Sequence, residues 1–441
     1  MIRLFRNPTR KTILFIWLGW VFVMLGYQIY VPARLALATP DYALNWTVNE
    51  TKPGSQDGKV YLNEPFLNQH VSWDSEYYLA IAVGGYEDPN IHRIGTFVNP
   101  TGSSTSGFWP FVIPTGSAGT RVGFPLSYAF FPFYPFAIRV LSAPLSLLGL
   151  NPIATATLAG VLVSVLGALA GMLALYELAR DELGEAGALR TAFYLIIFPS
   201  GFFLAQVYTE GLFIGLAFTT LVLLRRGHLG WAALVAVLAT FTRAVGVALI
   251  IPMTIAWVRT SAWLELDLEW RQIYFKGLPW KVIARSLLIF TPVVAFLIWR
   301  VSYFGMSFSK VEEEFFGRGL LNFGVSFITW SSAFRDLFGT NSQAAAYYLI
   351  EWLAIILGFT ACITELKRNP DLAWFGLLVV FLSFTSGPAQ GMHRYILAAP
   401  PVFLFLGRLG RHPAFDRVWS LTSILLMGIL AMLFTFNMWT G

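Results

Sequence analysis

The sequence predicts an all-helical protein that crosses a membrane many times. Of its 441 residues, 56% are hydrophobic and only 12% are charged, whereas about 25% of the residues in a soluble domain are charged. Apolar runs also recur along the chain at lengths that suit a bilayer. This composition excludes a soluble globular enzyme and a disordered chain. The net charge of +6 indicates Lys and Arg on the inner membrane face rather than a surface for nucleic acid.

The chain begins with a basic segment and an apolar run. Arg3, Arg6, Arg10 and Lys11 precede the run 13–31. A signal peptide also has a charged start, but this run is long for one, and no cleavage site of small residues follows it directly. We therefore expect 13–31 to be a retained first span that enters the membrane from the inside.

A large outer loop is predicted over residues 32–150. Its first part, from 32 to about 125, is rich in Asn, Thr, Ser and Gly and contains no run of about 20 apolar residues. Segment 127–149 is apolar but is interrupted by prolines and by Arg139. We expect it to form a bent helix on the outer membrane surface. The loop is too long to be only a connector.

The other spans are predicted within 151–441, and residues 1–441 form one integral-membrane domain. About eleven spans in all, with the C-terminus outside, place the basic clusters between them on the inner side. This arrangement requires 230–258 to be two short spans that meet near Arg243. The apolar runs after the loop are 153–177, 189–207, 208–224, 230–242, 244–258, 286–304, 345–364, 372–388, 394–407 and 418–438.

Ionisable residues near membrane depth collect at the outer face in this topology. Besides those discussed below, they include the run 312–314 and Glu351. Charged groups in a bilayer are costly and commonly mark function. Asp74 and Glu76 lie where a helix is predicted to start. Asp74 is either an N-cap beside an interfacial anchor, Trp73, or a carboxylate held in place as a general base, for which Glu76 is the local competitor.

Further residues add to this candidate site, and two of them are arginines that could bind an anion. Glu210 is predicted to begin a span, where a carboxylate gains from the helix dipole. Arg243 lies between apolar runs and either pairs with Glu210 or binds a phosphate. His393 and Arg394 follow a Gly/Pro-broken loop, and Arg394 is either a snorkelling helix-end residue or a second cation on the same anion.

Aromatic residues around these positions suit sugar rings, and interfacial arginines suit a lipid phosphate. The predicted pocket residues are Trp73, Glu76, Tyr77, Tyr134 and Tyr208. The five histidines show no metal-binding spacing, and Cys362 is the only cysteine. No metal site and no cofactor are therefore implied, although carboxylates alone could hold a divalent cation such as Mg²⁺ or Mn²⁺.

Several motifs resemble the GPI mannosyltransferase II family. They are WD-x-x-x-Y followed by IA and GY over 73–86, FFPFYPFAIR over 130–139, PSGFF to YTEGLF over 199–213, ATFTRAVG over 239–246, and HRY over 393–395. The resemblance extends from about residue 73 to 255 and rests mainly on Arg394 and Tyr395 beyond that. A polar Gly/Ser-rich insertion at 102–119 departs from the family pattern.

The resemblance implies a member of the GT-C superfamily, whose enzymes take a sugar from a polyprenyl-phosphate donor on the non-cytosolic face. It implies a mannosyl donor, inversion at the anomeric carbon, short membrane-surface helices in the first outer loop and a catalytic acid in that loop, which maps to Asp74. Arg243, Arg394, Glu210 and His393 are then expected at the donor phosphate or sugar. The acceptor is expected to be a lipid or glycolipid.

The chain is similar to a bacterial member, in which the site would lie on the outer face of the plasma membrane and the acceptor would not be a GPI anchor. Two other functions stay open from the sequence. A transporter or flippase of a lipid-linked sugar would also have buried charges and many spans, but predicts broken helices at matching places in two halves. In a non-catalytic assembly partner, Trp73 and Asp74 would only begin a helix.

Overall fold

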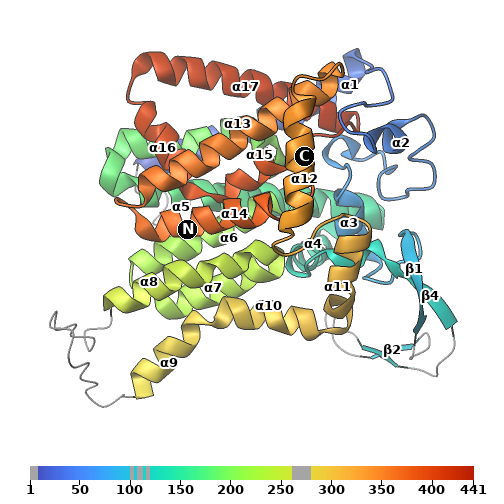
Figure 1. Ribbon diagram of the computed structural model, residues 1–441, viewed down its shortest axis with the longest axis horizontal. Coiled ribbons are helices and arrows are strands. Elements are labelled where there is room, and N and C mark those ends of the chain that lie inside the picture. The colour runs from blue at the N-terminus through green and yellow to red at the C-terminus, as the bar shows by residue number, and fades with distance from the viewer. Residues whose placement is uncertain (1–7, 100–103, 107–112, 116–119, 261–279) are drawn as a thin grey trace.

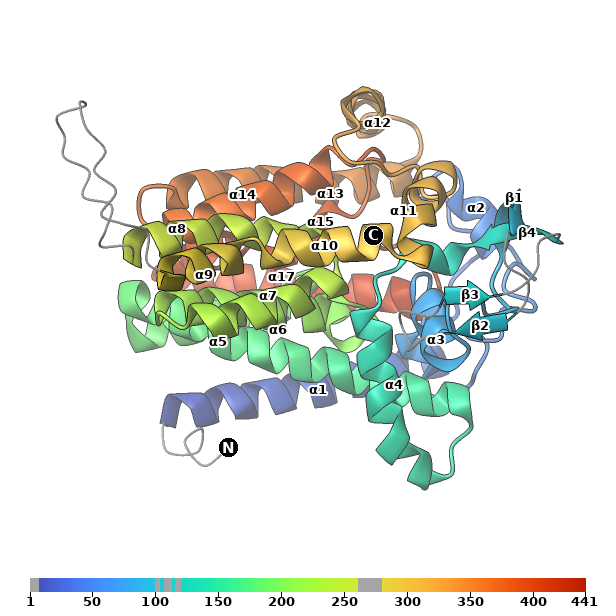
Figure 2. The ribbon, with the colours of Figure 1, turned by 90° about the horizontal axis from the view of Figure 1, so that it is seen from below.

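The computed structural model describes residues 8–99, 104–106, 113–115, 120–260 and 280–441. The predicted insertion at 102–119 therefore lies largely outside the described residues. The fold is a bundle of helices with a smaller cap at one end, where the short helices and the strands of the outer loop gather (Figure 2). The predicted all-helical membrane class is confirmed.

The first span and the outer loop contain one long helix and several short elements. The long helix is α1, and the strands form two small antiparallel pairs, β1 with β4 and β2 with β3. The elements are α1 (Pro8–Arg34), α2 (Thr47–Thr51), η2 (Asn68–His70), α3 (Ser75–Val83), β1 (Arg93–Asn99), β2 (Ser104–Ser106), β3 (Ile113–Thr115), β4 (Thr120–Pro125), η3 (Leu126–Ala129), α4 (Phe133–Leu145) and η4 (Ser146–Leu148).

The rest of the chain is helical and forms most of the bundle (Figure 1). The elements are α5 (Pro152–Ile197), η5 (Gly201–Ala205), α6 (Glu210–Arg225), α7 (Leu229–Thr242), η6 (Ala244–Leu249), α8 (Ile250–Thr260), α9 (Trp280–Ile289), α10 (Thr291–Val301), α11 (Tyr303–Glu314), α12 (Phe323–Asp336), α13 (Ser342–Glu365), α14 (Pro370–Phe384), α15 (Met392–Tyr395), η7 (Ile396–Ala398), α16 (Pro400–Leu409) and α17 (Pro413–Thr435).

Four of the described helices, α1, α5, α13 and α17, are long and apolar enough to cross a membrane. The pair α10 and α11, bent by 86°, could form a fifth span. The count of about eleven is not confirmed, because several predicted spans are apolar helices of only 10–17 residues. Helix α5 leaves helical geometry at Gly184, between the predicted runs 153–177 and 189–207.

Two predicted interruptions of helical segments agree with the structure. Segment 127–149 contains α4 and two short 3-10 turns, and α4 runs across the long helices beside the cap (Figure 2). The stretch 230–258 is interrupted at Arg243, where extended backbone (φ −150°, ψ 140°) separates α7 from η6. The break lets the Arg243 side chain project from a turn between packed helices.

A close backbone contact between α5 and α6 fixes the place of Glu210. A Cβ atom on Gly167 would lie 2.4 Å from the carbonyl oxygen of Gly211, so only glycine permits this approach. The first turn of α6 is thereby held against the middle of α5. Glu210, at the start of α6, faces the cap end of the bundle as a result.

Candidate active site

A cavity of about 1050 Å³ lies between the cap and the bundle. Its lining comes from the outer loop, from the first turn of α6, from the break at Arg243, from α11 and from the segment that carries α15. Segments far apart in the chain therefore build one site. The predicted residues Asp74, Glu210, Arg243 and Arg394 all line it.

Asp74 is held at the start of α3 by unusual backbone. Trp73, just before it, has a φ of 51°, in the left-handed region that a bulky residue seldom adopts and that occurs often at functional sites. The Asp74 side chain makes no capping hydrogen bond to α3. Its backbone N–H instead donates to the Tyr208 hydroxyl at 3.3 Å, which donates to the Ser72 carbonyl at 3.1 Å. Asp74 therefore occupies the N-cap position without capping α3 through its side chain, and it lines the cavity.

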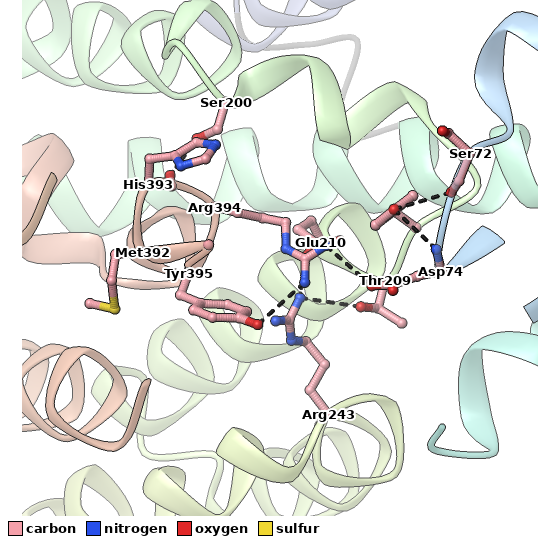
Figure 3. A network of polar contacts seen from close by, with 12 residues as sticks. Ser72, Asp74, Ser200, Thr209, Glu210, Arg243, Met392, His393, Arg394 and Tyr395 are labelled. Atoms are coloured by element: carbon pink, nitrogen blue, oxygen red, sulfur yellow. Dashed lines mark hydrogen bonds and ion pairs between the residues drawn. The ribbon is translucent and has the colours of Figure 1, made fainter. Parts of the chain in front are cut away.

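Asp74 belongs to a cluster of two arginines and two carboxylates (Figure 3). Arg394 Nη1 donates to Asp74 Oδ2 at 3.2 Å, and Arg394 Nε lies 3.3 Å from Glu210 Oε1. Arg243 pairs with the same Glu210 oxygen and donates to the Thr209 hydroxyl at 3.2 Å. Glu210 thus joins both arginines, and its charge offsets part of theirs in a buried place.

The ring of Tyr395 organises the cations. The guanidinium carbons of Arg394, Arg243 and Arg318 lie 5.2, 5.3 and 5.3 Å from its centroid, respectively. A phenol ring attracts such cations through its negative face. Arg243 and Arg318 each make only part of their hydrogen bonds to described residues, Arg243 to Thr209 and Glu210 and Arg318 to Ser386. Their remaining N–H groups can bind an anion in the cavity.

His393 lies outside the cavity lining, unlike Arg394 beside it. Its Nδ1 is 3.2 Å from Glu351 Oε1. The fully buried Glu351 also accepts backbone N–H groups of Gly391 (2.6 Å), Met392 (2.6 Å) and His393 (3.3 Å). The placement of His393 at the donor is therefore corrected: its ring contacts Glu351, and together they fix the turn that presents Arg394.

This turn depends on one glycine. Gly391 has a φ of 81°, which glycine adopts readily and other residues do not. The resulting backbone directs consecutive N–H groups toward one carboxylate. Glu351 on α13 thus orients α15, and α15 orients Arg394 and Tyr395.

The predicted pocket residues divide into two groups. Trp73, Glu76 and Tyr77 line the cavity. Tyr134 and Tyr208 do not, because both are buried behind the lining, at 0% and 1% exposure. Tyr134 contacts the Ser164 hydroxyl, while Tyr208 holds the Asp74 backbone. Their placement in the lining is therefore corrected, since both support the wall from behind.

Glu76 differs from the other carboxylates of the site. It is only 7% exposed and lines the cavity, yet its carboxyl has no hydrogen-bond or ion-pair partner among the described residues. Burial raises its pKa from 4.5 to about 7, the nearby Lys59 lowers it and Glu50 raises it. An unpaired carboxyl at the wall of a cavity is ready to accept or donate a hydrogen bond to a ligand.

Sequence reasoning missed three contributors to the site. Arg318 follows the acidic run 312–314 and was not among the predicted site residues. Its position between two glycines, after two aromatic residues, was a signal that could have identified it. Tyr395 was noted only as part of a motif, and Thr209 only as part of another. In the described part of the chain, no group of three His, Cys, Asp or Glu side chains is close enough to hold a metal ion.

The arrangement offers a carboxylate beside a strongly cationic wall. Asp74 is 22% exposed as a side chain, so a ligand hydroxyl can reach it. The arginines can stabilise negative charge that develops on a ligand, which is the main electrostatic demand of group transfer from phosphate. The site therefore suits deprotonation of a hydroxyl next to a bound phosphate.

The chain is also similar to a known protein family. The profile of the mannosyltransferase (PIG-V) family matches residues 108–319, and the family resemblance seen in the sequence is confirmed. The matched range contains Glu210, Arg243 and Arg318 but neither Asp74 nor Arg394. No curated protein is significantly similar to the chain.

Solved structures of two kinds are similar to the chain at low sequence identity. An oligosaccharyltransferase of Archaeoglobus fulgidus, crystallised with a tethered acceptor peptide, is 12% identical, with a TM-score of 0.43 over 96% of this chain and 55% of that chain. ArnT from Cupriavidus metallidurans in the apo state is 17% identical, with a TM-score of 0.42 over 86% of this chain and 62% of that chain. ArnT bound to undecaprenyl phosphate is 14% identical, with a TM-score of 0.41 over 95% and 76%. The chain thus spans a little over half the length of the first two.

Proposed function

We propose that this chain, with its match to the mannosyltransferase (PIG-V) family, is a membrane glycosyltransferase. It moves a hexose, mannose first among the candidates, from a polyprenyl-phosphate donor to a lipid or glycolipid acceptor with inversion. The observation that carries the proposal is the ion-paired cluster of Asp74, Arg394, Glu210 and Arg243 around one cavity.

The donor phosphate belongs with the arginines. Arg394 is committed to Asp74, Glu210 and the Tyr395 hydroxyl, whereas Arg243 and Arg318 keep N–H groups toward the cavity. We therefore assign the phosphate mainly to Arg243 and Arg318. Arg394 holds the Asp74 carboxylate in place and adds positive charge nearby.

The reaction needs one base and no general acid. Asp74 takes the proton of the acceptor hydroxyl as its oxygen forms a bond to the anomeric carbon of the donor. The bond from that carbon to the phosphate oxygen breaks, and the polyprenyl phosphate leaves with the electron pair. The arginines stabilise the added negative charge, so the leaving group needs no proton, in contrast to the alkoxide released by a glycosidase.

The orientation of the chain supports catalysis on the outer face. Basic side chains pair with acids at the end of the bundle away from the cap, as in Arg10 with Glu177, Arg225 with Asp371 and Arg408 with Glu182. Positive residues favour the inner side of a membrane. The cavity, at the cap end, would then open on the non-cytosolic face of the plasma membrane.

A transfer assay tests this function. Purified protein in lipid nanodiscs is incubated with radiolabelled polyprenyl-phosphate mannose and total lipid extract from the host. We expect label to move into a new lipid, with the anomeric configuration opposite to that of the donor. Retention of all label in a donor that the protein binds would contradict the proposal and direct attention to donor flipping in liposomes.

A further inference from the structure

The cavity has a second candidate recognition surface, made of tryptophans, one of which is next to Asp74 in the chain. Trp46, Trp73 and Trp439 all line it. Their rings meet edge to face, with centroids 5.7 Å apart for Trp46 and Trp73, 4.7 Å for Trp46 and Trp439, and 5.2 Å for Trp73 and Trp439. We call these three residues the tryptophan cluster.

Two members of the tryptophan cluster are fixed from behind. Trp73 Nε1 donates to the Met438 carbonyl at 3.3 Å, and Trp439 Nε1 donates to the Tyr347 hydroxyl at 3.1 Å. Trp46 rests against both and is 39% exposed. Trp46 therefore keeps part of its indole ring accessible, where it can stack against a ligand. Since Trp73 directly precedes Asp74, a ligand on the cluster lies beside the proposed base.

Glu76 gives an independent sign of a ligand in the same part of the cavity. Its carboxyl is buried, has no partner among the described residues, and lies near Glu50 and Lys59, which pair with each other at 3.1 Å and also line the cavity. Such a carboxyl at the wall of a cavity can accept or donate a hydrogen bond to a ligand. Because Glu50 and Lys59 offset each other's charge, this part of the cavity does not favour an anionic ligand.

We infer that the tryptophan cluster and Glu76 form the acceptor subsite, and that the acceptor presents a neutral sugar headgroup. A sugar ring offers C–H faces to the indoles and hydroxyls to Glu76, and one of its hydroxyls can reach Asp74. The identification of this subsite with the acceptor rests on the proposed function. The subsite itself can be tested by binding alone, without turnover.

The experiment measures binding of octyl α-mannoside to the full chain in phosphatidylcholine nanodiscs, by saturation-transfer NMR without donor. We expect saturable binding by wild type and a rise in Kd of about tenfold for Trp46→Ala. Glu76→Gln should also weaken binding, whereas Trp46→Phe, which keeps a ring, should retain most of it. Trp231→Ala, at a tryptophan 66% exposed on α7 and outside the cavity lining, should bind like wild type.

Three results would overturn the subsite. They are no saturable binding of the mannoside by wild type, unchanged binding by Trp46→Ala, and equal weakening by Trp231→Ala. Tighter binding of a serine-containing peptide than of the mannoside would also contradict a sugar acceptor. Donor transfer is followed in parallel. Binding of the mannoside without any transfer would support the subsite and refute the transferase function. Transfer without mannoside binding would support the transferase function and refute the subsite.

Discussion

Arg394 Nη1 and Asp74 Oδ2 lie 3.2 Å apart across the cavity, although 320 residues separate them in the chain. The pair joins the outer loop to the last part of the bundle. It also sets the orientation of the carboxylate that we propose as the base. We therefore propose different tasks for the two arginines of the cluster, with Arg394 orienting Asp74 and Arg243 binding the donor.

Lysine substitutions separate these tasks. Arg243→Lys loses the planar fork that suits phosphate, and we expect the donor KM to rise about 10-fold or more. Arg394→Lys should instead lower kcat with a smaller change in donor KM, because Asp74 loses its fixed orientation. Steady-state kinetics with varied donor measures both. Identical changes in KM and kcat for the two variants would refute the division.

Substitution of Glu351 tests how α15 is positioned. Glu351→Ala leaves three backbone N–H groups and His393 without their partner, so we expect a loss of about 3–5 kcal/mol of stability. Glu351→Gln keeps an acceptor oxygen and should remain folded, with reduced kcat and an unchanged donor KM. Thermal unfolding and kinetics in nanodiscs give these values.

A matched control lies on the same helix. Glu365 is also fully buried, pairs with Arg408 and is outside the cavity lining. Glu365→Gln should lose stability but keep kcat per folded molecule. If Glu351→Gln also keeps full kcat, Glu351 only stabilises the fold and does not position the site.

The pH dependence of stability should report Glu76. Its pKa is raised from 4.5 to about 7 in the folded chain, so the folded state holds a proton that the unfolded state has released. Stability is then full below about pH 4.5 and falls as pH rises toward 7, by about 3 kcal/mol in total. Glu76→Gln should remove this fall. Thermal unfolding in nanodiscs from pH 4.5 to 8 compares the two, and an equal slope in both would show that other groups carry it.

Local sequence patterns predicted much of the fold for a physical reason. Apolar length and basic flanks reflect the cost of placing charge and unpaired backbone in lipid, and they marked α1, α13 and α17 closely. The break at Arg243 was also predicted, because the basic clusters fall on the inner side only if 230–258 is two short spans. The number of spans was harder to predict from the sequence, since helices such as α7, α14 and α16 are too short to be identified as spans by length alone.

The charged residues of the candidate site were predicted from the sequence, but the residues that hold them in place were not. Asp74, Glu210, Arg243 and Arg394 stand out in an apolar chain because each is expensive to bury. The orientation of His393 depends on Glu351, 42 residues away, and Tyr134 and Tyr208 are buried by tertiary packing. No local pattern carries such information. The meeting of Trp439 with Trp46 and Trp73 likewise arises only when the two ends of the chain pack together.

The most direct test of the account is Asp74→Asn, measured for both donor binding and transfer. The amide keeps the size of the side chain and a hydrogen-bond acceptor for Arg394 but cannot take a proton from a hydroxyl. We predict that the variant binds polyprenyl-phosphate mannose as wild type does and transfers it about 10²–10⁴ times more slowly, while Asp57→Asn, at an exposed loop position, behaves as wild type. Transfer at the wild-type rate by Asp74→Asn would contradict the central claim that this carboxylate is the base.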